Sequence, residues 1–272
     1  NGKESIGHGL NLLDATNNMM LYGNFLKAND LIEQVLPIFS ESSAADELYL
    51  ADLYLKKAEI LLALGDYNEA LNIINDKESF YLQRSLKSKS EKLSNDEEET
   101  RYEDVARWIT LKSNALRLRG EFLRSDSAFV FGENWIKDKL GKRSKYFTDH
   151  LFYFAQMLEE NGTNELPASY FKDAYIYSLS ALGDIHPFTL RNLEKLVINS
   201  INDGNSGKAS AYYKDLEKIL KANFDKSSTH FVKLASISFE SDLRQGKVKK
   251  IESQAKKLLA DANILPIDHP DR

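Results

Sequence analysis

Residues Ala51 to Ile74 decide the fold, and they read Ala-Asp-Leu-Tyr-Leu-Lys-Lys-Ala-Glu-Ile-Leu-Leu-Ala-Leu-Gly-Asp-Tyr-Asn-Glu-Ala-Leu-Asn-Ile-Ile. Apolar side chains recur at spacings of three and four residues on both sides of Gly65, which is typical of two amphipathic helices. Gly65 stands where a tightly ending helix needs a positive φ, which glycine adopts without a Cβ clash. Asp66 and Asn68 suit the start of the second helix. The stretch therefore predicts a hairpin made of a helix A, a tight turn and a helix B.

The same turn recurs along the chain with a period of 42 residues. The glycines that mark it are Gly23, Gly65, Gly120, Gly162, Gly204 and Gly246. Every step is 42 residues except the second, which is 55, or one period plus an insertion of 13. A fixed period in this range is the signature of a repeat array, in which each unit buries its apolar face against its neighbours. We expect an all-α solenoid in one repeat domain over 1–272, with hairpins at about 6–40, 46–80, 101–140, 144–182, 186–223 and 228–263.

Alignment on the glycines also shows columns of large and of small residues. The positions 11 before and nine after each glycine are mostly large and apolar, as in Leu151 and Phe171, and would fill the seams between hairpins. The positions seven before and five after are mostly small, as in Ala58 and Ala70, which lets helices A and B of one hairpin approach closely. The sixth unit has the large residues Phe239 and Ile251 at these positions, so it is atypical or its register is slightly shifted.

This pattern resembles the tetratricopeptide repeat. The run Leu64-Gly65-Asp66-Tyr67, with Ala58 and Ala70, matches that family's consensus. The period of 42 residues and the run Leu182-Gly-Asp-Ile-His-Pro-Phe-Thr189 are similar to the longer variant in kinesin light chains and many bacterial proteins, where a His-Pro-x-Thr element opens helix A. The resemblance covers nearly the whole chain and implies a right-handed superhelix of hairpins.

Composition narrows the classes of function. The chain has 42% apolar and 28% charged residues, a formal net charge of −5 and no cysteine. The absence of cysteine excludes disulfides, thiolate metal sites and cysteine nucleophiles. No basic stripe predicts nucleic-acid binding, and no apolar run approaches the length of a membrane span. We expect a soluble chain, and a cytoplasmic location is favoured over export.

The insertion lies at about 85–100, where the sequence is serine-rich and dense in charges of both signs. Such a segment cannot bury much apolar area. We interpret it as an extension of the preceding helix B followed by a mobile loop. The alternative is a phosphorylated or partner-binding loop, because Ser88, Ser90 and Ser94 stand among charges.

Both ends suggest a piece of a longer protein. The chain begins Asn1-Gly2 rather than with methionine, and His269-Pro270 stands one period after the phase set by His186-Pro187. A seventh repeat is therefore expected to begin there, although a chance His-Pro pair explains the tail equally well.

By resemblance, ligands of this family lie along the concave face, which helix A lines. The lining positions fall 13, ten and six residues before each glycine, and those singled out for a peptide or partner protein are Arg107, Asn114, Phe152, Gln156, Arg191, Glu194 and Lys233. Amides would bind a peptide backbone, cations would pair with acidic groups or a terminal carboxylate, and Phe152 would be an exposed aromatic anchor. Asp52 and Glu59 stand where the family's carboxylate clamp needs positive or neutral residues, so no clamp is assigned.

Nothing in the sequence predicts catalysis or a cofactor. The chain has no G-x-S-x-G, P-loop or G-x-G-x-x-G motif, and its five histidines do not have metal-ligand spacing. We therefore expect a non-enzymatic scaffold that binds a protein or peptide, without metal, cofactor, nucleic acid or membrane insertion. The alternative is a ligand- or peptide-sensing domain that controls a downstream effector, a kinase or a caspase-like protease, in the same polypeptide.

Overall fold

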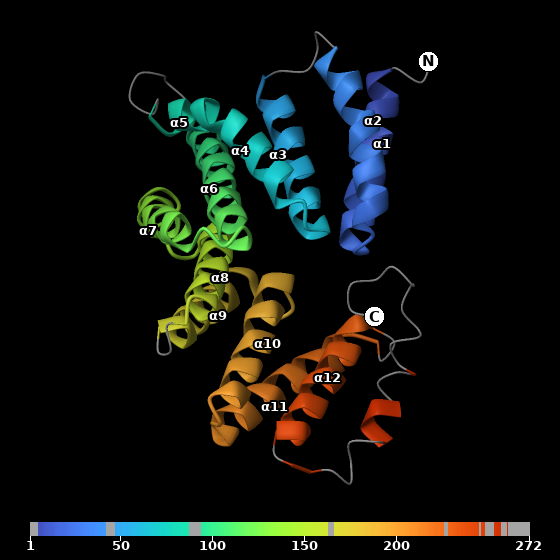
Figure 1. Ribbon diagram of the computed structural model, residues 1–272, viewed down its shortest axis with the longest axis vertical. Helices are drawn as coiled ribbons and strands as arrows, with labels where there is room; N and C mark the ends of the chain where they lie inside the picture. Colours follow the sequence, from blue (N-terminus) through green and yellow to red (C-terminus); the bar gives the residue numbers. More distant parts are fainter. Residues whose placement is uncertain are drawn as a thin grey trace. The chain divides into compact units, whose positions relative to one another are not determined.

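The computed structural model describes residues 5–41, 47–86, 94–162, 166–225, 228–244, 246–247, 253–256 and 260, and every element in these ranges is helical (Figure 1). The all-α class predicted from the period of 42 residues is confirmed. Some of the sequence predictions fall on residues outside these ranges, namely the loop serines Ser88 and Ser90, the pair His269-Pro270, and Ile251 with most of the second helix expected in the sixth hairpin.

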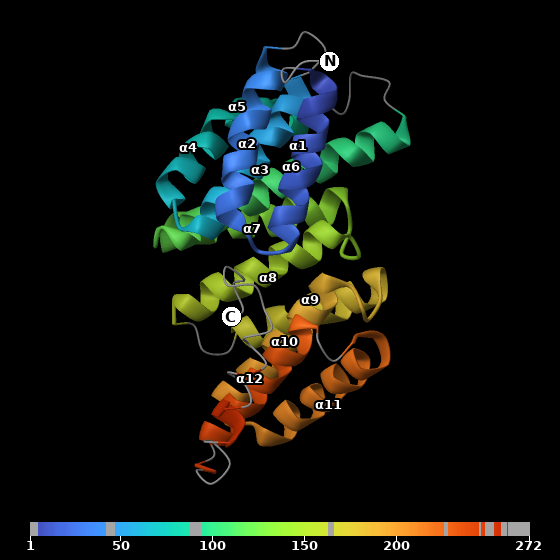
Figure 2. The same cartoon turned by 90° about the vertical axis from the view of Figure 1, so that its right-hand side faces the viewer.

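The chain divides into two compact units, of which the first covers 1–142. Its helices are α1 (Ile6–Leu21), α2 (Phe25–Ser40), α3 (Glu47–Leu64), α4 (Tyr67–Asp76), α5 (Glu78–Leu86), α6 (Asn95–Leu118) and α7 (Phe122–Lys139). Neighbours in sequence pack as pairs, α1 with α2, α3 with α4 and α6 with α7 (Figure 2). α3 also packs on α2, and α6 packs on α3, α4 and α5.

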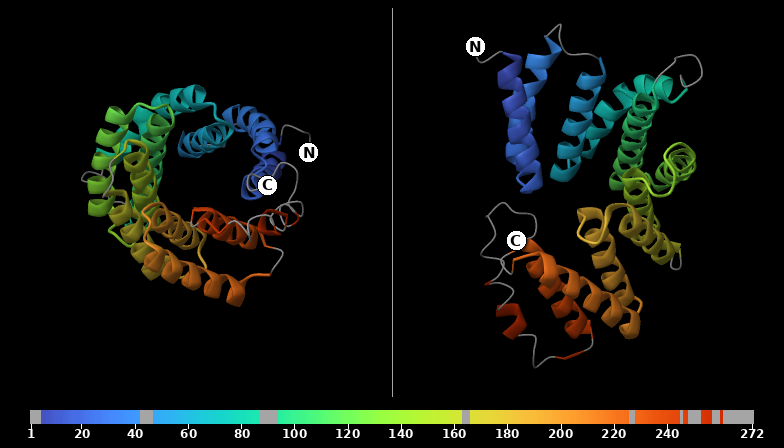
Figure 3. Two further views of the ribbon diagram at one scale, coloured as in Figure 1. Left: turned by 60° about the horizontal axis from the view of Figure 1, so that its bottom comes forward. Right: turned by 180° about the vertical axis from the view of Figure 1, so that it is seen from behind.

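The second unit covers 143–272. Its helices are α8 (Lys145–Glu160), α9 (Leu166–Leu182), α10 (Pro187–Asn202), α11 (Ser206–Asn223) and α12 (Thr229–Arg244). The pairs are α8 with α9 and α10 with α11, and α10 also packs on α8, α9 and α12; the colour key lets the reader follow them in Figure 3. In each unit, helices from successive hairpins therefore lie beside one another.

The repeat glycines end the A helices in the way that the sequence predicts. All six have positive φ, between 67° and 88°. At Gly65 the glycine N–H donates to the Leu62 carbonyl at 3.3 Å, and the next N–H, of Asp66, donates to the Leu61 carbonyl at 2.9 Å. This pair of bonds is the Schellman motif, which satisfies carbonyls that the helix end leaves open. Asp66 precedes α4 as its N-cap, but its side chain makes no capping bond.

The small columns lie where the two helices of a hairpin meet. In the first five units all ten residues of these columns are buried. In the third unit the contact is a hydrogen bond, because Ser125 Oγ on α7 donates to the Ser113 carbonyl on α6 at 3.0 Å. Larger side chains at these positions would push the helices apart, since protein interiors are close-packed.

The large columns fill the seams of both units. In the first unit Ile74 and Ile109 belong to one apolar cluster, in which the ring of Tyr81 stacks on Trp108 with centroids 5.7 Å apart. In the second unit Phe171 packs against Phe152, and their ring centroids are 5.6 Å apart. Burial of such side chains, at about 1.5–3 kcal/mol each, is what holds neighbouring hairpins together.

The insertion forms more regular structure than the sequence predicts. Residues Glu78–Leu86 form the separate helix α5, and α6 begins at Asn95, before the expected start at 101. Ser94 is the N-cap of α6: its hydroxyl accepts from the Glu97 N–H, and the Glu97 carboxylate accepts from the Ser94 N–H at 2.9 Å. Ser94 therefore belongs to a capping box, a helix start rather than the middle of a loop.

Candidate functional site

The positions 13, ten and six residues before each repeat glycine lie on the A helices, and we call these positions the A-helix row. In the first unit the row joins α3 and α6, which pack on each other, and in the second it joins α8, α10 and α12 through the contacts of α10 with both neighbours. Each unit thus brings together row residues that are one period apart in the sequence.

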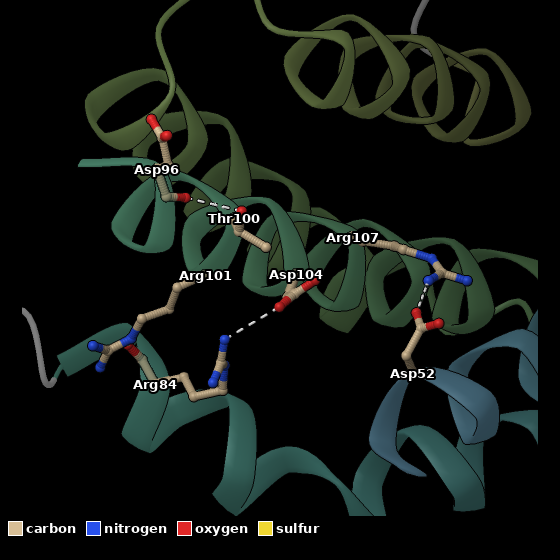
Figure 4. Close-up of polar contacts among 7 residues, drawn as sticks. All are labelled: Asp52, Arg84, Asp96, Thr100, Arg101, Asp104 and Arg107. Carbon is tan, nitrogen blue, oxygen red and sulfur yellow. Dashed lines mark hydrogen bonds and ion pairs between the residues drawn. The ribbon is translucent and has the colours of Figure 1, made fainter. Parts of the chain in front are cut away.

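Arg107 on α6 is the centre of the row in the first unit. Its Nη1 pairs with Asp52 on α3 (Figure 4). Its Nε donates to Glu59 Oε1, also on α3, at 2.9 Å. Burial lowers the pKa of the guanidinium, but the two carboxylates outweigh burial, so that the pKa of Arg107 lies above its ordinary value. The Arg107 guanidinium therefore stays protonated, and its ion pairs with the two carboxylates tie α6 to α3.

A second charged group lies beside Arg107, where α5 crosses α6 (Figure 4). Arg84 on α5 pairs with Asp104 on α6 at 3.2 Å, and Arg101 Nε donates to the Arg84 carbonyl at 2.6 Å. Burial raises the pKa of the Asp104 carboxyl, and Arg84 opposes that shift. The sequence analysis does not predict this charged group, because the pairing depends on helix α5. The sequence signals α5 through the 13 residues by which the step from Gly65 to Gly120 exceeds the period.

In the second unit Arg191 on α10 has the same place in its repeat as Arg107. Its Nη2 donates to Asp149 Oδ1 on α8 at 2.7 Å. Its guanidinium also lies over three aromatic rings, with distances to the centroid of 3.7 Å for Phe152, 4.8 Å for Phe188 and 5.3 Å for Tyr153. One carboxylate and the faces of these rings hold the cation in place.

Phe152 is not the exposed anchor that the sequence predicts. Only 6% of the residue is exposed, because it packs against Phe171 on one side and is covered by Arg191 on the other. An aromatic ring in a lining column gains more from burial under a neighbouring cation than from exposure to water. Its role is therefore to support Arg191, and the expectation of a free aromatic surface is corrected.

The remaining row residues differ in how much of each side chain is exposed and able to contact a ligand. Asn114 is buried, and its Oδ1 accepts from Arg117 Nε at 2.9 Å, so this amide oxygen already has an intramolecular donor. Gln156 is half-buried on α8, and so is Lys233 on α12. Glu194 on α10 faces His230, which precedes Lys233 on α12, with 3.9 Å between Oε1 and Nδ1. The structure thus brings the predicted residues into two groups, one in each unit.

Groups for other chemistry are not gathered in the described part of the chain. No cluster of three or more histidine, aspartate or glutamate side chains that could hold a metal ion occurs there. Among the helices that the structure describes, none combines the length and the apolar character that crossing a bilayer requires.

The fold defines the class, since this chain has the helical hairpin fold of tetratricopeptide-type repeat proteins. Its structure is similar to that of the Rap conjugation gene regulator of the plasmid pLS20 in complex with the Phr* peptide, with a TM-score of 0.71 and 15% identity over 92% of this chain and 61% of that one. It is also similar to a Rap protein complexed with Competence and Sporulation Factor, with a TM-score of 0.69 and 13% identity over 91% and 64% of the two chains.

A third similar structure holds the TPR-like repeats of a kinesin light chain from Podosopora anserina, with a TM-score of 0.61 and 10% identity over 80% of this chain and 96% of that one. This chain spans less than two thirds of the length of the two Rap chains. No protein-family profile and no curated protein sequence matches it.

Proposed function

We propose that this chain is a non-enzymatic scaffold that binds a peptide or a partner protein along the A-helix row. Two of the similar structures support a peptide, since one Rap regulator was solved in complex with the Phr* peptide and another Rap protein with Competence and Sporulation Factor. At 13–15% identity this likeness is one of fold. The binding residues of the proposal come from the row of this chain, namely Arg107, Asn114, Gln156, Arg191, Glu194 and Lys233, and the buried Phe152 supports Arg191 from below.

The observation that carries the proposal is the pairing of row residues across successive A helices. Asp52 contacts Arg107, and Asp149 contacts Arg191, although the partners are 55 and 42 residues apart in the sequence. A ligand that crosses these helices would meet the same position of each repeat in turn. The ion pairs hold the long arginine side chains in place before any ligand arrives, and such preorganisation lowers the entropy cost of binding.

The charges of the row favour a neutral or basic ligand over an acidic one. Five row residues are acidic (Asp52, Glu59, Asp149, Glu194 and Glu240) and three are basic (Arg107, Arg191 and Lys233). Arg107 and Arg191 already pair with carboxylates of the chain. A ligand carboxylate would have to displace these carboxylates of the chain. A ligand cation would instead meet more acidic than basic side chains in the row, of which Glu240 already pairs with Arg244. The sequence analysis expects Arg107 and Arg191 to pair with acidic groups of the ligand, whereas in the structure both pair with carboxylates of the chain itself.

Selection from a random heptapeptide library displayed on phage would test the proposal. Recovered peptides would be labelled and their affinity for the chain measured by fluorescence anisotropy. We expect Gln156→Ala and Lys233→Ala each to weaken binding about tenfold, which corresponds to about 1.4 kcal/mol. Lys221→Ala is the matched control, because Lys221 lies exposed on α11, outside the row, and pairs with Glu217 one turn away. Equal affinities for the row variants and the control would contradict the A-helix row as the site.

The alternative is a ligand- or peptide-sensing domain that controls a downstream effector, a kinase or a caspase-like protease, in the same polypeptide. It is favoured by the likeness to the Rap conjugation gene regulator, whose structure was solved in complex with the Phr* peptide. A sensor should be stabilised by a short peptide alone, so its melting temperature should rise with peptide concentration. An effector would be encoded after Arg272, and the sequence of the parent reading frame tests that part.

A further inference from the structure

A groove in the first unit lies on the side of α6 opposite the A-helix row. It has a volume of about 590 Å³, with α6 as its floor and α5 and α7 as its walls. Trp108, Ile109 and Leu116 of α6 line it, whereas Arg107 belongs to the row. At about 3.6 residues per turn, Leu116 lies half a turn from Arg107 around the helix. Occupation of this groove would therefore leave the row free.

The walls of the groove leave large apolar side chains in water. Leu123 on α7 is 89% exposed and Phe131, two turns further along, is 52% exposed, while Leu82 faces them from α5. Exposed large apolar side chains that gather around one groove are typical of an interaction site. Phe131 lies eight residues after Leu123, or about 12 Å along the helix, which is the length of two turns of a partner helix.

The polar groups of the groove already bond within the chain. Ser113 Oγ donates to the Ile109 carbonyl at 2.8 Å, Ser127 Oγ donates to the Leu123 carbonyl at 3.1 Å, and Trp108 Nε1 donates to the Ile74 carbonyl at 3.1 Å. An extended peptide needs partners for its own N–H and C=O groups, and this lining offers it few. A helix satisfies its backbone internally, so the groove suits a helix.

The charged side chains at the groove indicate which charges the docked helix should carry beside its apolar side chains. Lys112 and Arg124 line the groove, and Glu78 is the one acidic side chain among the lining residues that the structure describes. Lys112 pairs with Glu78 at 2.5 Å, and Arg124 pairs with Glu121 at 2.5 Å in an exposed contact. Exposed pairs contribute little, about 0–1 kcal/mol, so the Arg124 guanidinium can turn toward a ligand carboxylate.

We propose that the groove between α5 and α7 docks an amphipathic helix of a partner protein, with apolar anchors at i, i+4 and i+7 and carboxylates beside them. This is the helix-in-groove mode of recognition. The proposal is independent of the A-helix row, and the chain would hold a peptide on one side of α6 and a partner helix on the other.

Three synthetic peptides of about sixteen residues, or four helical turns, test the proposal by fluorescence anisotropy. The first carries leucines at i, i+4, i+7 and i+11 flanked by glutamates. The second has the same composition in scrambled order, and in the third lysines replace the glutamates. We expect the first peptide to bind, and the other two to bind at least tenfold more weakly.

Protein variants locate the site of that binding. Leu123→Asp should lower the affinity for the first peptide at least tenfold. Leu26→Asp is the matched control, because Leu26 is 71% exposed on α2, outside the groove. Both side chains are exposed, so the circular dichroism of both variants should equal that of the unaltered chain. Gln156→Ala should leave this binding unchanged, which separates it from binding at the A-helix row.

Four outcomes would overturn the proposal. They are no binding of the first peptide, equal binding of the scrambled peptide, equal binding to Leu123→Asp, and self-association of the chain that this substitution abolishes. The last outcome, measured by sedimentation velocity, would make a second copy of the chain the occupant in place of a partner helix.

Discussion

At the scale of single residues, the neighbour decides what a lining position can do. Phe152 and Gln156 both belong to the row of α8, but Arg191 covers Phe152 and leaves it buried, whereas Gln156 stays half-buried. Arg107 and Arg191 both carry charge toward the row, and carboxylates of the preceding A helix hold both. The identity of a side chain therefore gives its chemistry, and its neighbour gives its availability.

The first prediction concerns Phe152. Because the ring is buried against Phe171 and under Arg191, Phe152→Ala should lower the free energy of unfolding by about 2–5 kcal/mol. Phe171→Ala and Leu151→Ala should have effects of the same size, since both side chains are buried in the seam. Urea unfolding followed by circular dichroism measures all three. Unchanged stability of Phe152→Ala, together with a loss of ligand binding, would show that Phe152 is a ligand contact after all.

The second prediction concerns His186, the N-cap of α10, whose Nδ1 accepts from the Phe188 N–H at 3.2 Å. Burial lowers the pKa of His186, and the charges of Lys145 and Arg191 lower it further. The unfolded chain therefore binds this proton at a higher pH than the folded chain does. Stability from the neutral cap is present above the ordinary histidine pKa and should be lost as pH falls from about 7 to about 5.

His186→Asn tests this dependence, since asparagine is a good N-cap that does not titrate in this range. Denaturant unfolding at several pH values measures the free energy of unfolding of both proteins. As the pH falls, the free energy of unfolding of the variant should rise relative to that of the unaltered chain. A difference in stability that is the same at pH 7 and pH 5 would refute the assignment of the cap to neutral His186.

At the scale of elements, the ends of the helices carry the most specific information. The Schellman bonds at the repeat glycines follow from one residue type at one spacing, and they form in both units. The start of α6 follows from Ser94 and Glu97, a capping box that can be recognised in a sequence as serine followed three residues later by glutamate. The density of serine and charge around it instead favoured a loop interpretation.

The third prediction concerns this capping box. Ser94→Ala removes the acceptor of the Glu97 N–H and should cost roughly 1 kcal/mol of local helix stability. The first turn of α6 should then exchange its amide hydrogens faster, while the amides around Trp108 should be unaffected. Ser94→Thr keeps the hydroxyl and should preserve protection. Equal exchange in all three proteins would show that the box does not hold the start of α6.

At the scale of the whole molecule, contacts between helices are mostly between neighbours in the repeat order. The two units, 1–142 and 143–272, each contain complete helix pairs with their own apolar clusters. That the whole span forms one repeat domain, with its last hairpin reaching 263, stays a prediction. In such an array stability is roughly the sum of repeat and interface terms.

The fourth prediction follows from this organisation. The fragments 1–142 and 143–272, expressed separately, should each show helical circular dichroism and a cooperative thermal transition, because each keeps most of its packing partners. Each fragment should melt at a lower temperature than the full chain if an interface between neighbouring repeats is lost. A fragment without helical signal would contradict the neighbour-only packing of an array.

The sequence by itself determined the class of fold, the turns and the closely packed positions of this protein. These features depend on local chemistry repeated at a fixed period, such as positive φ at Gly65 or a small side chain at Ala58, and a periodic signal survives in any single chain. The tertiary structure alone decided that Arg107 and Arg191 are paired, that Phe152 is buried, and that α5 and α7 enclose an apolar groove. Those outcomes depend on side chains that the fold brings together from 42 or 55 residues away and on the path of a non-periodic insertion, because packing in three dimensions sets them.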